Sequence, residues 1–148
     1  MTQTSSAESA ESFPSAVSVR EKLITILSEK GYETANIQTS FWSIDESKLL
    51  HVAAGEKKNT KFEFYGYSDG DTVDLVYNQI VYSTSPELSP KEREEKEVSL
   101  KGSGKMFTLK ESGTSYVVLY KNDTVIYAHS RQALDEINGI LKSIGYIE

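Results

Sequence analysis

The 148-residue sequence contains no cysteine, and this absence excludes several kinds of chemistry at once. Without thiols the chain has no disulfide, no cysteine zinc site, no iron–sulfur cluster and no thiolate catalysis. Histidine is nearly as scarce, since His51 and His129 are the only two. An ordinary zinc site needs three or four ligands, so these two would need neighbouring strands and an added carboxylate. The sequence indicates no metal and no cofactor.

The sequence also lacks any long apolar segment. No stretch approaches the roughly 18 consecutive apolar residues that a membrane span requires. Positive charge is in short supply, because 16 Lys and Arg residues oppose 22 Asp and Glu residues and the net charge is −6 at pH 7. Nucleic acid and anionic lipid both require a basic surface, so we expect neither to be a partner.

Residues 1–17 lack what a folded segment needs. After Met1, the first 16 residues contain one large apolar side chain, Phe13, among Ser, Thr, Ala and Glu. They also have neither the cationic start nor the apolar core of a signal peptide. Burial of so little apolar surface does not offset the entropy of ordering the chain. We therefore expect a disordered Ser/Thr/Glu-rich tether over residues 1–17 and a single folded domain over residues 18–148.

The patterning of the folded part predicts an α+β domain. Helices are expected to begin at Ser18, Asp71 and Ser130, each followed by apolar residues three or four positions apart. Alternating side chains predict strands over 48–54, 61–67, 106–110, 115–121 and 124–129, with 41–44 as a further candidate. The order is helix, strands, helix, meander, helix. We expect an antiparallel sheet of five to six strands with three helices packed chiefly on one face.

Residues 84–104 differ in character from the rest of the domain. Pro90 suits the first position of a helix, but the Glu92–Glu97 run that follows has no apolar stripe. Gly102 and Gly104 indicate a flexible hinge. We therefore expect a long exposed acidic connection over 84–104, which is unusual inside a compact domain and hence a candidate functional segment.

No motif that carries chemistry is complete. Asp69, Asp71 and Asp74 lack the spacing of an EF-hand calcium loop and indicate a turn with a helix cap. Residues 102–105 lack the preceding glycine of a phosphate-binding loop. Glu63 lies between two phenylalanines, but neighbours in a strand point to opposite faces, so we expect this carboxylate to face solvent. The sequence therefore favours a protein that is not an enzyme.

The aromatic residues are the most informative feature, because nine tyrosines are many for this length. Alternation places tyrosines on one face of their strands and other apolar residues on the opposite face. A sheet that is apolar on both faces must be covered on both or must present one face to a partner. Tyrosine suits an interface because it combines a large area with a polar tip, although packing in the core or at its rim is the alternative. The candidate binding residues are Tyr65, Tyr67, Tyr116 and Tyr120.

Three features combine into a familiar layout: the Ser/Thr/Glu-rich leader, the acidic cysteine-free domain, and the ending Ile-x-x-Ile-Leu-Lys-x-Ile-Gly-Tyr over residues 137–146. This layout resembles that of small extracytoplasmic lipoproteins of Gram-positive bacteria. The resemblance implies an extracellular location and attachment to the membrane through an acylated N-terminal cysteine, which this sequence does not contain. A cytoplasmic location is the alternative if Met1 is a native start.

Together these observations predict a non-enzymatic, surface-tethered domain that binds a protein or another component of the cell envelope. The alternative is a small-molecule carrier with an apolar pocket between sheet and helices, lined by Trp42, Phe62 and Phe64. A third hypothesis is an enzyme with an unrecognised site, which would contain a buried carboxylate or histidine with a shifted pKa in a cleft.

Overall fold

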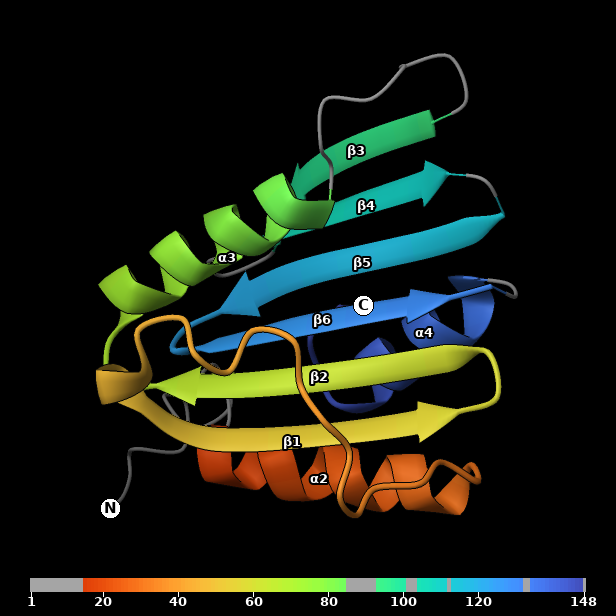
Figure 1. Cartoon of the computed structure of the whole chain (residues 1–148), viewed down its shortest axis with the longest axis horizontal. Helices are drawn as coiled ribbons and strands as arrows, with labels where there is room; N and C mark the ends of the chain where they lie inside the picture. Colours follow the sequence, from red (N-terminus) through yellow and green to blue (C-terminus); the bar gives the residue numbers. More distant parts are fainter. Residues whose placement is uncertain (1–14, 85–92, 101–103, 112, 132–133, 148) are drawn as a thin grey trace, which may run out of the picture.

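The computed structural model describes residues 15–84, 93–100, 104–111, 113–131 and 134–147, which form a six-stranded antiparallel sheet and three α-helices (Figure 1). The strand order is β1-β2-β6-β5-β4-β3, and every neighbouring pair is antiparallel. This confirms the predicted α+β fold class. The elements are α2 (Ala16–Glu29), a short 3₁₀ turn η1 (Glu46–Lys48), β1 (Leu49–Lys57), β2 (Thr60–Tyr67), α3 (Gly70–Thr84), β3 (Arg93–Ser99), β4 (Lys105–Glu111), β5 (Thr114–Lys121), β6 (Thr124–Ser130) and α4 (Leu134–Ser143).

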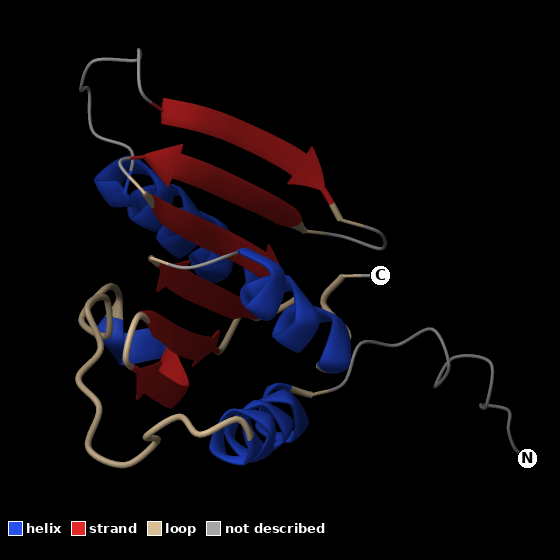
Figure 2. Cartoon of the chain, turned by 90° about the vertical axis from the view of Figure 1, so that its right-hand side faces the viewer, coloured by secondary structure: helices blue, strands red, loops and turns tan. Residues whose placement is uncertain are grey.

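Helices cover both faces of the sheet. Figure 2 shows α2 and α4 on one side of the strands and α3 on the other. The expectation that the helices pack chiefly on one face is therefore wrong. The physical reason lies in the strands, which are apolar on both faces and need a cover on each.

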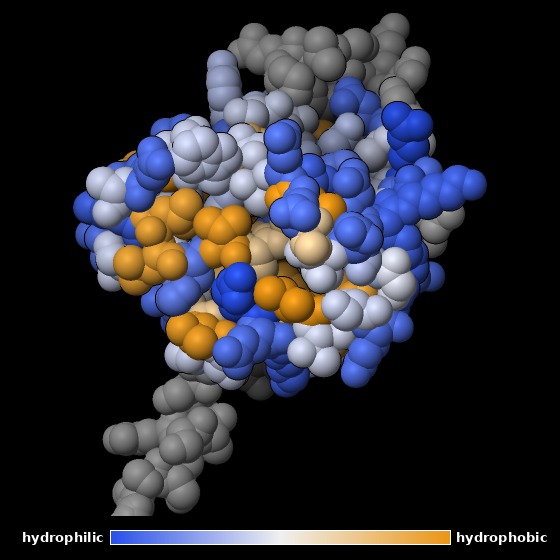
Figure 3. Space-filling model, turned by 60° about the horizontal axis from the view of Figure 1, so that its bottom comes forward, coloured by the Kyte–Doolittle hydropathy of each residue, from blue (hydrophilic) through white to orange (hydrophobic). Residues whose placement is uncertain are grey.

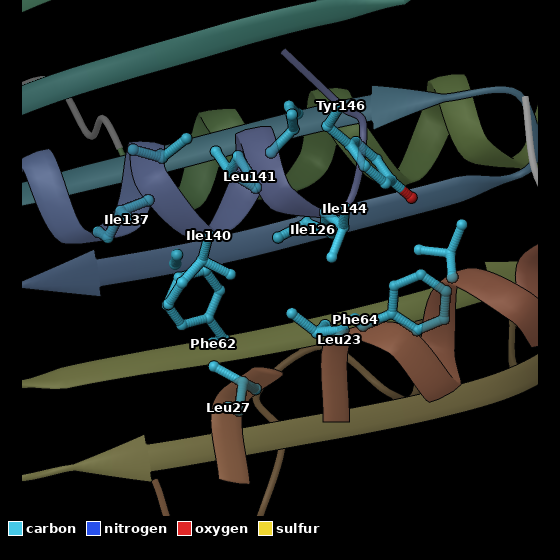
Figure 4. Packing of buried hydrophobic residues seen from close by; sticks show 14 of the residues in the cluster. Leu23, Leu27, Phe62, Phe64, Ile126, Ile137, Ile140, Leu141, Ile144 and Tyr146 are labelled. Carbon is cyan, nitrogen blue, oxygen red and sulfur yellow. The ribbon is translucent and has the colours of Figure 1, made fainter. Parts of the chain in front are cut away.

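The sheet has a separate core on each face. We call the face that carries Phe62 and Phe64 the phenylalanine face, and the face that carries Tyr65 and Tyr67 the tyrosine face. On the phenylalanine face, Phe62 and Phe64 are fully buried against α2 and α4 (Figure 4). On the tyrosine face, Tyr65 and Tyr67 are fully buried in a cluster that includes α3. The predicted alternation is thus confirmed. The further strand members are Ala53, Met106, Val117, Leu119, Ile126 and Ala128 on the phenylalanine face, and Phe107, Leu109, Val118, Val125 and Tyr127 on the tyrosine face.

Helix α2 begins earlier than the sequence predicts. Ser15 is the N-cap, and its hydroxyl oxygen accepts a hydrogen bond from the Ser18 amide at 3.2 Å. Ala16 is buried in the core, so starting the helix there adds apolar contact that a start at Ser18 would lose. The folded domain consequently reaches into the segment expected to be tether, while residues 1–14 lie outside the described residues.

The start of α3 also differs from expectation. The Asp69 carboxylate accepts a hydrogen bond from the Thr72 amide at 2.7 Å, so Asp69 rather than Asp71 caps α3. Ser130 is the last residue of β6, and its hydroxyl lies 2.8 Å from that of Thr60 across the strand pair. Helix α4 is described from Leu134, and residues 132–133, whose amides a cap at Ser130 would engage, lie outside the described residues. Serine and aspartate suit caps and turns alike, so only the neighbouring elements decide which role applies.

The expected acidic connection contains an edge strand. Arg93–Ser99 pair along their length with β4, which corrects the prediction that 84–104 is a plain connection. The apolar stripe that a buried element needs is missing because an edge strand exposes many of its side chains, and charge on an edge opposes unwanted pairing. The expected helix start at Pro90 and the glycine at position 102 lie outside the described residues.

Gly104 occupies a tight turn that no other residue fits. Its φ is +128°, and a Cβ atom there would lie 2.2 Å from the backbone oxygen of Tyr120. Its own carbonyl accepts a hydrogen bond from the Leu100 amide at 3.0 Å. Gly104 thus lies at a close approach to the Tyr120 backbone, while residues 101–103 of the expected hinge lie outside the described residues.

Replacing Gly104 with alanine should lower the free energy of unfolding by about 3 kcal/mol, because backbone strain and a backbone clash add together. Urea unfolding measures this change. Gly139→Ala is the matched control, since Gly139 lies inside α4 and a Cβ atom there meets no atom within 4 Å. That control should stabilise the domain by about 0.5–1 kcal/mol. Equal effects of the two substitutions would contradict the described turn.

Candidate functional site

Tyr65 and Tyr67 lie in the core of the tyrosine face. Neither has any exposed surface, because residues 33–45, which we call the covering loop, pass over them. The Tyr65 hydroxyl accepts a hydrogen bond from the Phe41 amide at 3.0 Å, and the Tyr67 hydroxyl donates to the Ile44 carbonyl at 3.2 Å. Burial raises the pKa of Tyr67 to about 12. The structure therefore gives these two predicted binding residues a packing role and no open surface.

Glu63 is buried, contrary to the expectation that it faces solvent. Its carboxylate accepts hydrogen bonds from the Ser40 amide at 2.8 Å and the Ser40 hydroxyl at 3.1 Å, and a third from the Tyr65 hydroxyl. The Lys61 ammonium lies 3.7 Å away. Because protein donors surround both oxygens, this carboxylate ties the covering loop to the sheet, and the arrangement favours an anchoring role over proton transfer.

The other two predicted tyrosines are partly buried and lie at opposite ends of β5. Tyr120 packs edge-on against Tyr77 of α3, with ring centroids 4.9 Å apart. Burial raises the pKa of Tyr120. Tyr116 lies beside His129 of β6, with ring centroids 6.0 Å apart. Of the four predicted residues, Tyr116 borders the hollow described next.

The residues that line this hollow lie where β1 and β6 end and β2 and β5 begin, at the right-hand end of these strands in Figure 1. The volume of the hollow is about 480 Å³. Strand register places Lys61, His129 and Tyr116 side by side across β2, β6 and β5. The backbone amide of Arg131 donates to the Asn59 carbonyl at 2.9 Å and so holds Arg131 against the β1–β2 turn. The lining residues are Glu56, Lys57, Lys58, Asn59, Thr60, Lys61, Thr114, Tyr116, His129 and Arg131.

The lining of the hollow is cationic although the whole chain is acidic. It contains three lysines and one arginine but a single glutamate. Two of the lysines have partners, because Lys57 lies 3.1 Å from Glu136 and Lys61 lies 3.7 Å from Glu63. Within the described part of the chain, the side chains of Lys58 and Arg131 form no salt bridge. These two cations can therefore meet an anion without giving up a partner.

The His129 ring adds no charge to this site at neutral pH. Burial lowers its pKa, and the nearby cations Lys61 and Arg131 lower it further, against an opposing effect of Glu63. The ring is consequently neutral at pH 7. Its contribution to the hollow is an aromatic surface and two ring nitrogens.

The structure does not bring the two histidines together. His51 lies on β1 and His129 on β6, and β2 separates these strands. The condition for a shared zinc site, neighbouring strands, is therefore not met. Among the residues that the structure describes, no three His, Asp or Glu side chains are grouped so that they could hold a metal ion.

The residues expected to line an apolar pocket between sheet and helices do not lie together. Phe62 and Phe64 are fully buried on the phenylalanine face, whereas the neighbours of Trp42 in the covering loop, Phe41 and Ile44, pack on the tyrosine face. Trp42 itself is 47% exposed. The three residues that were predicted to line one carrier pocket thus lie on opposite sides of the sheet.

Exposed apolar side chains are scattered over the described surface. Leu50 on β1 is 59% exposed and Val17 at the start of α2 is 47% exposed. Figure 3 shows the apolar groups on one face interspersed with hydrophilic residues. Single exposed apolar residues are common on soluble domains and need no partner to explain them. None of the described helices is both long enough and apolar enough to cross a membrane.

The cationic lining was missed in the sequence because its members come from two distant segments. Residues 56–59 have the pattern of a hairpin turn between the expected strands 48–54 and 61–67. Arg131 lies 70 positions after Lys61 and becomes a neighbour of this segment only when β2 pairs with β6. A signal was present, since three of the five residues in 57–61 are lysines in an otherwise acidic chain.

Comparisons with known proteins are sparse for this chain. No protein-family model matches it, and no curated protein matches its sequence. A crystal structure of a GTP binding regulator from Thermotoga maritima is similar, with a TM-score of 0.52 and 13% sequence identity over 88% of this chain and 87% of the other. At this identity the likeness concerns the fold alone.

Proposed function

We propose that this chain is a small, non-enzymatic binding domain whose ligand is anchored through an anionic group in the hollow. The observation that carries the proposal is a hollow bordered by the cations Lys58, Lys61 and Arg131 in a protein of net charge −6. Lys57 also borders the hollow, but its ammonium is engaged by Glu136 and the Tyr32 ring. The fold-level likeness to a GTP binding regulator agrees with a binding role.

The physical argument rests on charge and shape. Arginine and lysine bind carboxylate and phosphate oxygens through charge-assisted hydrogen bonds, and arginine does so with two donors at once. A concave site focuses the electric field of such side chains, so a local cationic hollow attracts an anion even in an acidic protein. A volume of about 480 Å³ also falls within the range of small-ligand sites, roughly 300–1,000 Å³.

Pyrophosphate titration by calorimetry and by NMR tests this proposal. We expect saturable binding that perturbs the amides of residues 57–61 and 129–131 and weakens with added salt. Arg131→Gln and Lys58→Gln should each lower the affinity roughly tenfold, the effect of one charge-assisted hydrogen bond of about 1.5 kcal/mol.

Lys22→Gln is the control for non-specific charge effects, because Lys22 is exposed on α2, an element that contributes no lining residue to the hollow. Its affinity for pyrophosphate should equal that of the wild type. Absence of saturable binding, or an equal loss in the Lys22→Gln variant, would remove the support for an anion site.

We further propose that the domain works outside the cell, attached to the membrane, and binds a protein or another envelope component there. The composition of residues 1–17 and the resemblance to Gram-positive lipoproteins support this location. Surface proteolysis of intact source cells, followed by immunoblotting, tests it. A chain that resists added protease and fractionates with the cytosol would contradict the proposal.

A further inference from the structure

A row of aromatic rings leads from the covering loop to the hollow. Phe41 packs edge-on against Tyr127, with ring centroids 5.3 Å apart. Tyr127 contacts His129 at 5.5 Å, and His129 contacts Tyr116 at 6.0 Å with an angle of 40° between the ring planes. Tyr127 is buried, whereas His129 and Tyr116 are partly exposed and line the hollow. The row therefore ends in two rings that a ligand can reach.

These two rings are supported from behind. The imidazole has two aromatic neighbours, the buried Tyr127 on its own strand and Tyr116 on β5. The imidazole is neutral at pH 7 because burial lowers its pKa, which makes it a stacking surface rather than a further cation. A rigid, partly buried ring pair loses little conformational entropy when a ligand binds.

The cations lie next to the same rings. Tyr116 pairs with His129 across β5 and β6, and Arg131 follows His129 by two positions along the chain. The β1–β2 turn that contains Lys58 is hydrogen-bonded to Arg131 through Asn59. The hollow is thus lined both by cations and by aromatic rings.

We propose that the ligand carries its anionic group on a flat ring, which stacks on Tyr116 beside His129 while Lys58 and Arg131 bind the anion. This inference rests on the proposed function, because it specifies the ligand of the same hollow. Stacking on an exposed aromatic side chain and a charge-assisted hydrogen bond act on different parts of one ligand, so their effects can be separated.

Two matched pairs of probes test the inference, and the members of each pair differ mainly by a ring. Inorganic phosphate is compared with phenyl phosphate, and propane-1,2,3-tricarboxylate with benzene-1,3,5-tricarboxylate, each by calorimetry and NMR. We expect the ring-bearing member of at least one pair to bind roughly tenfold more tightly, the effect of one stacked ring. The pair that shows this preference identifies the anion as phosphate or carboxylate.

Tyr116→Leu should abolish the preference for the ring, so that the two members of the pair bind the variant with equal affinity. Tyr82→Leu is the matched control, since Tyr82 is 75% exposed on α3, and it should keep the preference. Transferred NOEs between ligand ring protons and the Tyr116 ring in the wild-type protein give a second readout that does not depend on the stability of a variant.

The possible outcomes separate the two proposals. Equal affinities within both pairs, with the ring-free anions still bound in the hollow, would overturn the ring and leave the anion site. A preference for the ring that survives Tyr116→Leu, with no transferred NOE to Tyr116, would also overturn it. Failure of all four probes and of pyrophosphate to bind would overturn the proposed function itself.

Discussion

Raising the pH above 10 should unfold this domain cooperatively, because most of its tyrosines are buried as neutral phenols. Six of the nine tyrosines expose 8% of their surface or less. Burial raises the pKa of Tyr67 and Tyr127 to about 12 and raises the pKa values of the other four further. The six residues are Tyr32, Tyr65, Tyr67, Tyr77, Tyr127 and Tyr146.

The direction of the effect follows from proton linkage. Above pH 10 the unfolded chain releases its phenolic protons while the folded domain retains them, so alkali favours the unfolded state. The stabilisation is fully present below pH 10 and is lost as the pH rises toward the folded-state pKa values. Each tyrosine contributes about 1.4 kcal/mol per pH unit, and six together contribute about 8 kcal/mol. Since domains are stable by about 5–15 kcal/mol, we expect the midpoint between about pH 10.5 and 11.5.

Circular dichroism and phenolate absorbance measure this transition together. The six buried phenols ionise only when the domain unfolds, so the larger part of the rise in phenolate absorbance should coincide with the loss of the circular dichroism signal. Tyr67→Phe removes one of six titrating groups, so the free energy of unfolding should fall with pH about one sixth less steeply than in the wild type. Tyr82→Phe, at an exposed tyrosine, should leave this steepness unchanged. Ionisation of more than three of the nine tyrosines in a still folded domain would contradict the described burial.

Removing the Glu63 side chain should strongly lower the stability of the domain. Glu63→Ala deprives Tyr65 and Ser40 of their acceptor and leaves Lys61, whose side chain is 18% exposed, without its partner. The loss of charge-assisted hydrogen bonds and the uncompensated buried groups should lower the free energy of unfolding by about 3–4 kcal/mol. Urea unfolding gives the value.

Two companion variants make the Glu63 result specific. Glu63→Gln keeps the shape and one acceptor oxygen, so we expect a smaller loss of about 1–2 kcal/mol. Glu21→Ala removes an exposed carboxylate from α2 and should change stability by less than about 0.5 kcal/mol. If all three variants unfold at the same urea concentration, the described anchoring is refuted.

Hydrogen exchange locates the Glu63 effect within the molecule. The amides of Ser40 and Phe41 are held by Glu63 and Tyr65, so their exchange should accelerate in Glu63→Ala more than exchange in α4 does. Uniform acceleration across the domain would indicate a general loss of stability rather than release of the covering loop.

The local patterns of the sequence were sufficient for most of the secondary structure. The alternation around Phe62 and Tyr65, and around Val117 and Tyr116, placed those side chains on the correct faces because a strand has a period of two whatever packs against it. Helix boundaries were less predictable: Ser15, Ser18 and Ser130 all suit a cap, and the choice among them depends on contacts with other elements.

The edge strand β3 and the hollow could not be predicted from local sequence patterns. An edge strand with charged side chains has little apolar pattern, so Arg93–Ser99 resembled a surface connection. The candidate site depends on Lys61, His129 and Tyr116, which come from three strands and become neighbours only through sheet register.

The sequence by itself determined the fold class, the two apolar faces of the strands and the exclusion of cysteine chemistry, because composition and periodicity are properties of the chain alone. The tertiary structure decided how each face is covered and which side chains remain accessible. It buried Tyr65 and Tyr67 under the covering loop and made Glu63 an anchor. It also gathered Lys58 and Arg131 beside Tyr116, since burial and proximity depend on residues that lie far apart in the sequence.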